Sequence, residues 1–148
     1  MNQKYFTVEE ATKSLALVNP IVKDIMLKRK KMITLKKAIR DMQLSENKKY
    51  YELKTQEASK LLKNISREIT YHLEELEMVG CYLKDFETGI IDFPSIIKGK
   101  VVFLCWMYGE PKVQNWHDLT AGFEGRKEIS TEFTTLTITP ARKYHPNE

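Results

Sequence analysis

The stretch LEMVGCYLKDFETGIIDFPSIIKGKVVFLCW, residues 76–106, decides the fold because the spacing of its apolar residues changes at Gly80. Before Gly80, apolar residues recur every three or four positions, as on one face of a helix. After Gly80, short runs rich in Ile, Val and Phe alternate with turn residues, which is typical of antiparallel strands. The sequence therefore predicts an α+β fold, in which a long antiparallel helical hairpin precedes a small antiparallel β-sheet with ordered loops.

Two long helices are predicted upstream of Gly80, over about residues 7–44 and 46–79. The first begins at Thr7, whose hydroxyl can accept from N–H groups of the first turn. Glu10 lies three residues further on, where its side chain can reach back to complete a capping box. Gly80 is a suitable left-handed stop for the second helix.

Two residues modify these helices. Pro20 predicts a kink or a break just before it, because proline removes a backbone donor and crowds the preceding turn. Ser45 is a candidate cap for the second helix. The short connection makes the two helices antiparallel neighbours that pack along a coiled-coil-like seam. A hairpin buries only one seam, so its other apolar residues favour a homodimer; examples are Leu17, Leu62 and Leu73.

The region after Gly80 predicts three strands. Ile90–Phe93 is a short strand ended by Pro94, and Lys100–Trp106 is the strongest strand in the chain. Residues 111–126 show no periodicity and form an ordered loop or short strands that cover the sheet. We expect one domain over residues 1–127, made of the hairpin 7–79 and the β region 81–127. The Thr-rich segment 128–148 is an extension that can supply an edge strand.

Composition limits the class of protein. The 148 residues suffice for one domain, and 42% hydrophobic residues supply a core. No stretch approaches the roughly 18 consecutive apolar residues of a membrane-spanning helix, and no signal peptide is evident. We therefore expect a cytoplasmic protein with no membrane partner. Cys81 and Cys105 lie outside any CxxC spacing, so a disulfide is not expected in a reducing compartment.

Positive charge is concentrated in one segment. Residues 23–40 contain eight Lys or Arg and a single acid, although the whole chain has a net charge of only +4. Such a run is more typical of a solvated helix face. The alternative is a nucleic-acid contact, for which the candidates are Lys28, Arg29, Lys30 and Lys31.

The candidate chemistry lies between Asp85 and Arg126, where glycines permit tight turns. A divalent metal is one hypothesis, with the ligand types of residues Cys105, Glu110, His117 and Asp118. A small-molecule pocket is another, in which Arg126 recognises an anion, lined by Trp106, Glu110, Trp116, His117 and Arg126. The third is structural: the aromatic residues form a core, His117 bonds a backbone carbonyl, and Arg126 pairs with Glu124 or Asp92.

No catalytic motif supports an enzyme class. The chain has no serine elbow and no phosphate-cradling glycine loop. Catalytic residues and any cofactor are therefore unidentified from the sequence, and whether the protein is an enzyme stays open.

Several motifs in fixed order resemble a known family. They are FTVEEA at residues 6–11, VNP at 18–20, EMVG at 77–80, KDFETGIIDFP at 84–94, GKVVFLCW at 99–106, GEP at 109–111, WH at 116–117 and GFEGR at 122–126. Over residues 5–127 the chain is similar to the prokaryotic family catalogued as domain of unknown function 2203. The resemblance implies the same architecture and singles out residues 85–126, but it carries no catalytic residue with it.

Three functions follow from these features, taken in order. The first is a non-enzymatic interaction or regulatory module, in which the helical hairpin contacts a second copy or a protein partner. The alternative is a ligand- or metal-binding protein, or an enzyme, with its site between Cys105 and Arg126. The third is nucleic-acid binding through residues 28–40.

Overall fold

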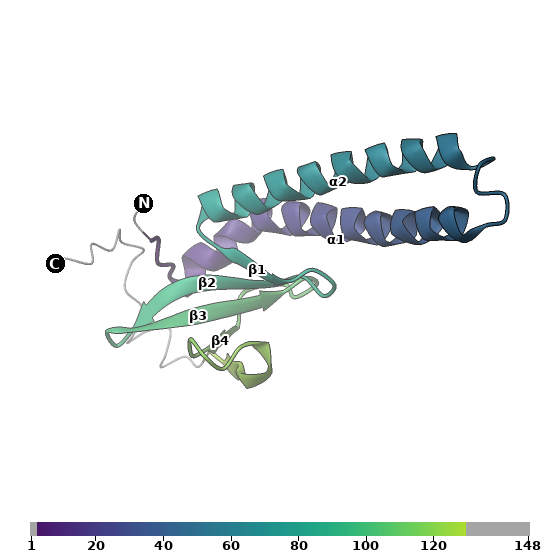
Figure 1. Cartoon of the computed structure of the whole chain (residues 1–148). Coiled ribbons are helices and arrows are strands. Elements are labelled where there is room, and N and C mark those ends of the chain that lie inside the picture. The colour runs from purple at the N-terminus through teal and green to yellow at the C-terminus, as the bar shows by residue number, and fades with distance from the viewer. Residues whose placement is uncertain (1–2, 130–148) are drawn as a thin grey trace.

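The computed structural model describes residues 3–129 and confirms the α+β fold. Two packed helices come first, and a five-stranded antiparallel sheet follows them (Figure 1). The elements are α1 (Val8–Leu44), α2 (Glu52–Val79), β1 (Tyr82–Asp85), β2 (Ile90–Ile97), β3 (Lys100–Met107), β4 (Asn115–His117), the 3-10 helix η1 (Phe123–Gly125) and β5 (Lys127–Glu128).

The start of α1 follows the predicted capping box. The Thr7 hydroxyl accepts from the Glu10 N–H at 3.1 Å, and the Thr7 N–H donates to the Glu10 carboxylate at 3.4 Å. The predicted break before Pro20 is wrong, because α1 runs without interruption through this residue. A proline inside a helix costs about 3 kcal/mol. Burial of Val18 and Val22 on either side offsets this, at about 1.5–3 kcal/mol for each side chain.

The second helix begins later than the sequence predicted. It starts at Glu52, and Ser45 ends α1 with an extended backbone instead of capping α2. The Ser45 hydroxyl accepts from the Asn47 N–H at 3.1 Å, so it stabilises the turn between the helices. The predicted stop at Gly80 is confirmed, with a left-handed backbone at φ +107°.

The sheet is a simple meander in the order β1-β2-β3-β4-β5. Its second strand does not end at Pro94, as the sequence predicted, but continues to Ile97. The carbonyl of Pro94 accepts from the Phe6 N–H at 2.8 Å, so the N and C=O of this residue face the N-terminal segment and not β3. The missing proline N–H therefore removes no hydrogen bond between β2 and β3.

The sheet has two more strands than predicted. Strands β4 and β5 arise within and just after residues 111–126, where the sequence left short strands as one option. They are only 3 and 2 residues long, too short for a period-2 pattern to be recognised. The Thr-rich run expected as an edge strand lies outside the described residues.

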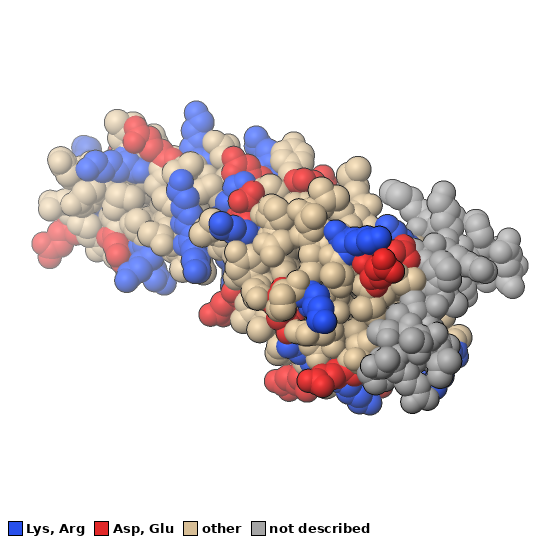
Figure 2. All heavy atoms as spheres, turned by 180° about the vertical axis from the view of Figure 1, so that it is seen from behind, with Lys and Arg blue, Asp and Glu red and all other residues tan. Residues whose placement is uncertain are grey.

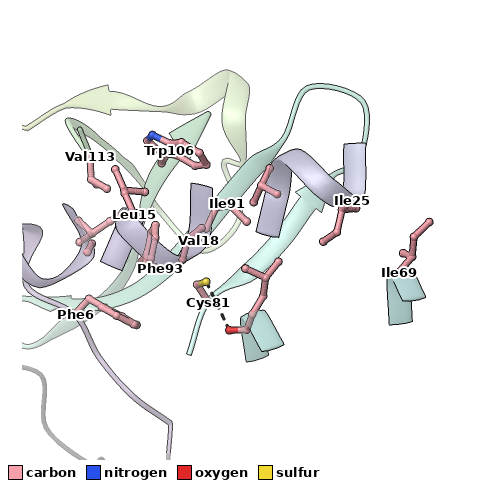
Figure 3. Close-up of a cluster of buried hydrophobic side chains, with 14 of the residues drawn as sticks. Phe6, Leu15, Val18, Ile25, Ile69, Cys81, Ile91, Phe93, Trp106 and Val113 are labelled. Atoms are coloured by element: carbon pink, nitrogen blue, oxygen red, sulfur yellow. Dashed lines mark hydrogen bonds between the residues drawn. The ribbon is translucent and has the colours of Figure 1, made fainter. Parts of the chain in front are cut away.

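The main core lies between the helices and one face of the sheet (Figure 3). Val18 and Ile25 of α1 are fully buried there, as are Phe93 of β2 and Trp106 of β3. The Cys81 thiol donates to the Leu76 carbonyl at 3.6 Å, which is the dashed line in Figure 3. This core fixes the position of β2 and β3, and these strands in turn position the opposite face of the sheet.

The far half of the hairpin projects away from the sheet (Figure 1, Figure 2). No residue between Met26 and Asn64 is buried, and we call residues 26–64 the hairpin arm. The 37 residues of α1 span about 55 Å at a rise of 1.5 Å per residue. Within residues 3–129, no helix has the length and apolarity needed to cross a lipid bilayer.

Candidate functional site

Strand register brings three polar side chains to one face of the sheet. Asp92 of β2 pairs with Cys105 of β3, and Cys105 pairs with Asn115 of β4. His117 lies two residues along β4 from Asn115, so it shares this face. Ile91 and Phe93 flank Asp92 and enter the main core, so Asp92 faces away from the helices. The site face is therefore the side of the sheet opposite α1 and α2.

Alternation places both tryptophans on the other face. Trp106 follows Cys105 and is fully buried in the main core. Trp116 pairs with Leu104, which belongs to the same core. The segment after β4 lies across the sheet from the helices (Figure 1). The two sides of the sheet are thus covered by different parts of the chain.

Asp92, Cys105 and His117 form a compact, buried cluster. Their candidate ligand atoms all lie within 4.8 Å of one another, and each side chain is buried. His117 Nε2 lies 2.9 Å from Oδ1 of Asp92. Among the described residues, this is the group of His, Cys and acidic side chains whose geometry suits a metal ion.

The tautomer of His117 follows from its second contact. Its Nδ1–H donates to the backbone oxygen of Asp118 at 2.7 Å, since a carbonyl oxygen can only accept. A neutral imidazole protonated at Nδ1 carries a lone pair at Nε2, and that lone pair faces the Asp92 carboxylate. The 2.9 Å contact therefore requires either a second proton or a cation between the two groups.

The Cys105 thiol completes the cluster. Burial raises the pKa of Cys105 to about 11, and the negative charge of Asp92 acts in the same direction. A hydrogen bond from Arg126 partly opposes this increase. The thiol is consequently protonated at neutral pH unless a bound cation stabilises the thiolate.

Arg126 joins this cluster to a second ion pair. Its guanidinium donates to both carboxylate oxygens of Glu110, at 2.9 and 2.7 Å. Burial opposes ionisation of Glu110, but the hydrogen bonds from Arg126 and the Met107 N–H outweigh it and hold the pKa of Glu110 below its usual value. The Arg126 guanidinium also lies 4.4 Å from the centre of the Phe123 ring. Arg126 is thereby fixed between Glu110 and Cys105.

A polar cleft of about 430 Å³ opens beside this ion pair. Asn115, the cross-strand neighbour of Cys105, lies in its wall, as does Arg126. The remaining lining residues are Glu110, Lys112, Gln114, Glu128 and Ile129. The cleft therefore approaches the buried cluster from the side of β4 and β5.

The structure brings together two of the four candidate metal ligands. Cys105 and His117 meet, whereas the Glu110 carboxylate is held by Arg126. The Asp118 carboxylate lies 3.7 Å from the Lys100 ammonium, and only the Asp118 backbone contacts His117. Asp92 takes the place of these two acids in the cluster.

The proposed small-molecule lining is divided between two faces. Glu110 and Arg126 line the cleft, and His117 is buried beside it. Trp106 and Trp116 lie on the helix-facing side, where the Trp106 indole N–H donates to the Glu110 carbonyl at 2.9 Å. The predicted pairing of Arg126 with Glu124 or Asp92 is wrong, because its carboxylate partner is Glu110.

Asp92 was named from the sequence only as an ion-pair partner. The signal that could have identified it is the predicted turn at residues 98–99. The register of the β2–β3 hairpin starts from the pair Ile97 and Lys100, so residues whose numbers add to 197 are partners. That rule places Asp92 opposite Cys105.

The four candidate nucleic-acid residues differ in their surroundings. Lys28 contacts His72 Nε2 at 2.8 Å and lies 3.5 Å from the Glu68 carboxylate. Arg29 lies over the Phe86 ring. Lys30 and Lys31 are exposed on the hairpin arm. Two of the four are therefore engaged within the protein, and two face solvent.

Comparison with known proteins gives a single assignment. The family model described as an uncharacterised conserved protein, DUF2203, matches residues 4–129. No curated protein and no solved structure matches the chain. The matched segment includes both helices, the sheet and every residue of the buried cluster. The chain therefore belongs to the uncharacterised conserved protein family DUF2203.

Proposed function

We propose that this protein binds one divalent transition-metal ion, with zinc the best match, through Asp92, Cys105 and His117. The observation that carries the proposal is the 2.9 Å contact between His117 Nε2 and the Asp92 carboxylate. Both atoms present lone pairs when the histidine is neutral. A cation between them replaces this repulsion with two coordinate bonds.

The ligand types and charges suit zinc. A thiolate and a carboxylate together supply two negative charges, which balance a divalent ion in a buried site. Mixed sulfur, nitrogen and oxygen ligands favour zinc over the oxygen-preferring magnesium and calcium. Zinc bonds of 2.0–2.3 Å in a tetrahedron separate ligand atoms by about 3.3–3.7 Å. The three side chains meet this geometry with shifts of about 1 Å or less from their observed separations.

The surroundings of the cluster support a functional metal site. The Asp118 carbonyl orients His117 through Nδ1, as outer partners of metal-binding histidines commonly do. Three protein ligands leave a fourth position for water or a small molecule. Arg126 contacts Cys105 and lines the cleft, so a ligand entering there meets a guanidinium beside the metal. This arrangement supports binding of a small polar or anionic molecule.

Removing one ligand should abolish tight metal binding. Native mass spectrometry of protein purified without chelator or metal-affinity resin should show one zinc per chain. With cobalt in place of zinc, a thiolate-to-cobalt charge-transfer band should appear and vanish in Cys105→Ser. The affinity of Cys105→Ser and of Asp92→Asn should fall more than about 100-fold, since even a lost outer partner costs 10–100-fold.

Two matched variants test whether these effects belong to the cluster. Cys81→Ser removes the other buried thiol, which lies on the helix side of the sheet. Asp118→Asn neutralises the acid next to His117 and leaves its backbone carbonyl in place. Both should retain the cobalt band and the zinc affinity. Wild-type protein that takes up no zinc or cobalt at micromolar concentration contradicts the proposal.

A homodimeric interaction module is the second candidate function, and the exposed tip of the hairpin arm favours it. Leu44, Tyr50 and Leu53 lie near the turn between the helices, with 78%, 75% and 67% of their surface exposed. Large apolar side chains gathered on a projecting element are typical of contact surfaces. We infer that the tip contacts a second copy or a protein partner.

A double change at the tip should dissociate the dimer. Burying a leucine contributes about 1.5–3 kcal/mol, so Leu44→Ser with Leu53→Ser should weaken dimerisation at least about 100-fold. Sedimentation velocity over a concentration series measures this. Leu119→Ser, which changes an exposed leucine outside the helices, should have no effect on the dimer. Wild-type protein that sediments as a monomer throughout the series refutes self-association.

A further inference from the structure

The hairpin arm carries most of the positive charge of this protein. Residues 26–64 contain twelve Lys or Arg and four Asp or Glu, a net charge of +8. The other residues have a net charge of −4, since the whole chain has +4. Figure 2 shows Lys and Arg side chains spread along this projecting element. The protein therefore separates a basic arm from a weakly acidic body.

Three lysines form a straight basic ridge on α1, which we define as Lys23, Lys30 and Lys37. A spacing of seven residues returns a helix to nearly the same side after about 10.5 Å. All three side chains are exposed. In the part of the chain that the structure describes, no carboxylate forms an ion pair with any of them. Their charge is thus available to an external partner.

The rest of the basic segment adds to this field. Lys31, Lys36 and Arg40 are also exposed and lack a carboxylate partner within residues 3–129. Lys28 is different because Glu68 and His72 hold it against α2. A cation attached to a rigid helix loses less freedom on binding than one in a flexible tail. The arm therefore presents several preorganised positive charges to a polyanion.

The residue types favour double-stranded nucleic acid over a single strand. Proteins that bind single strands stack bases on aromatic side chains. Residues 23–40 contain no Phe, Trp or Tyr. Lysines can neutralise backbone phosphates of a duplex without contacting bases.

A lipid surface is a poorer match. A helix that lies on a membrane gathers its apolar side chains on one face. Leu27 and Ile33, the exposed apolar residues beside the ridge, are six positions apart and point to different sides of α1. We propose that the basic ridge binds the phosphate backbone of double-stranded nucleic acid, without selecting a base sequence.

Salt dependence tests this proposal quantitatively. Fluorescence anisotropy with labelled 25-base-pair RNA and DNA duplexes should give a plot of log K against log salt with a slope of at least about −2.7, because three phosphates each contribute −0.9 for duplex DNA. Replacing Lys23, Lys30 and Lys37 with Gln should make the slope shallower by about 2.7. Two duplexes of unrelated sequence should bind equally, and the RNA and DNA arms show which duplex is preferred.

A matched variant separates the ridge from net charge. Lys13, Lys98 and Lys112 are exposed lysines outside the arm, and changing them to Gln removes the same three charges. This variant should keep the wild-type slope, and far-ultraviolet circular dichroism confirms that both variants are folded. Equal slopes in the two variants overturn the proposal. Binding to vesicles of phosphatidylserine and phosphatidylcholine without duplex binding also overturns it, in favour of a lipid surface.

Discussion

Replacing Trp106 with alanine should lower the free energy of unfolding by about 3–5 kcal/mol, the usual cost of deleting a buried aromatic side chain. Trp106 is fully buried between β3 and the helices. Its indole N–H also donates to the Glu110 carbonyl at 2.9 Å, so the substitution leaves this acceptor without its partner. Small domains have a total stability of about 5–15 kcal/mol, so a large part of it depends on this one residue.

Guanidinium unfolding followed by far-ultraviolet circular dichroism measures the effect, since the change removes a fluorophore. Trp116→Ala serves as the comparison because Trp116 is only partly buried, with Lys127 over its ring. Its loss should be clearly smaller. Trp106→Phe retains most apolar contact and removes the hydrogen bond, so an intermediate loss is expected. Equal stability of Trp106→Ala and Trp116→Ala would contradict the packing described for β3.

Gly89→Ala should destabilise the protein by about 2–5 kcal/mol. Gly89 has a φ of +73°, which costs a residue with a Cβ about 1–3 kcal/mol. A Cβ at this position would also lie 2.8 Å from Tyr108 Cβ and 3.0 Å from Val22 Cγ1. Overpacking of this kind adds about 1–3 kcal/mol. The turn between β1 and β2 therefore needs glycine both for its backbone and for its contact with α1.

Gly99→Ala separates these two causes. Gly99 has nearly the same φ, +76°, and a Cβ there would meet no atom within 4 Å. Its substitution should show the backbone cost alone. The difference between the two midpoints of unfolding then measures the packing of α1 against the β1–β2 turn. If the two variants are equally stable, the close approach of Val22 and Tyr108 to Gly89 is not real.

The general architecture could be predicted from the sequence because local rules decide it. Apolar spacing identified both helices, Thr7 and Glu10 identified the start of the first, and Gly80 identified the end of the second. The failures were also local. Pro20 was outweighed by the burial of its neighbours, and Pro94 faced the N-terminal segment, where its missing N–H removes no bond to β3.

The candidate site was only partly predictable. Cys105 and His117 were identified as residues of a suitable chemical type, but their third partner depends on strand register. A shift of one residue would turn Asp92 toward the helices and remove it from the cluster. The same alternation moved Trp106 and Trp116 to the opposite face, so the five residues of the predicted pocket do not share one cavity.

The sequence by itself determined the order and type of the main elements, because capping, turns and helix periodicity involve residues within about four positions of one another. It also determined that the hairpin is basic and the site region rich in chemically capable residues. Only the tertiary structure decided which of those residues meet. Asp92 and His117 are 25 positions apart, and Arg126 selects Glu110 over the nearer Glu124. Such contacts depend on how strands register and how the segment after β4 folds back across the sheet.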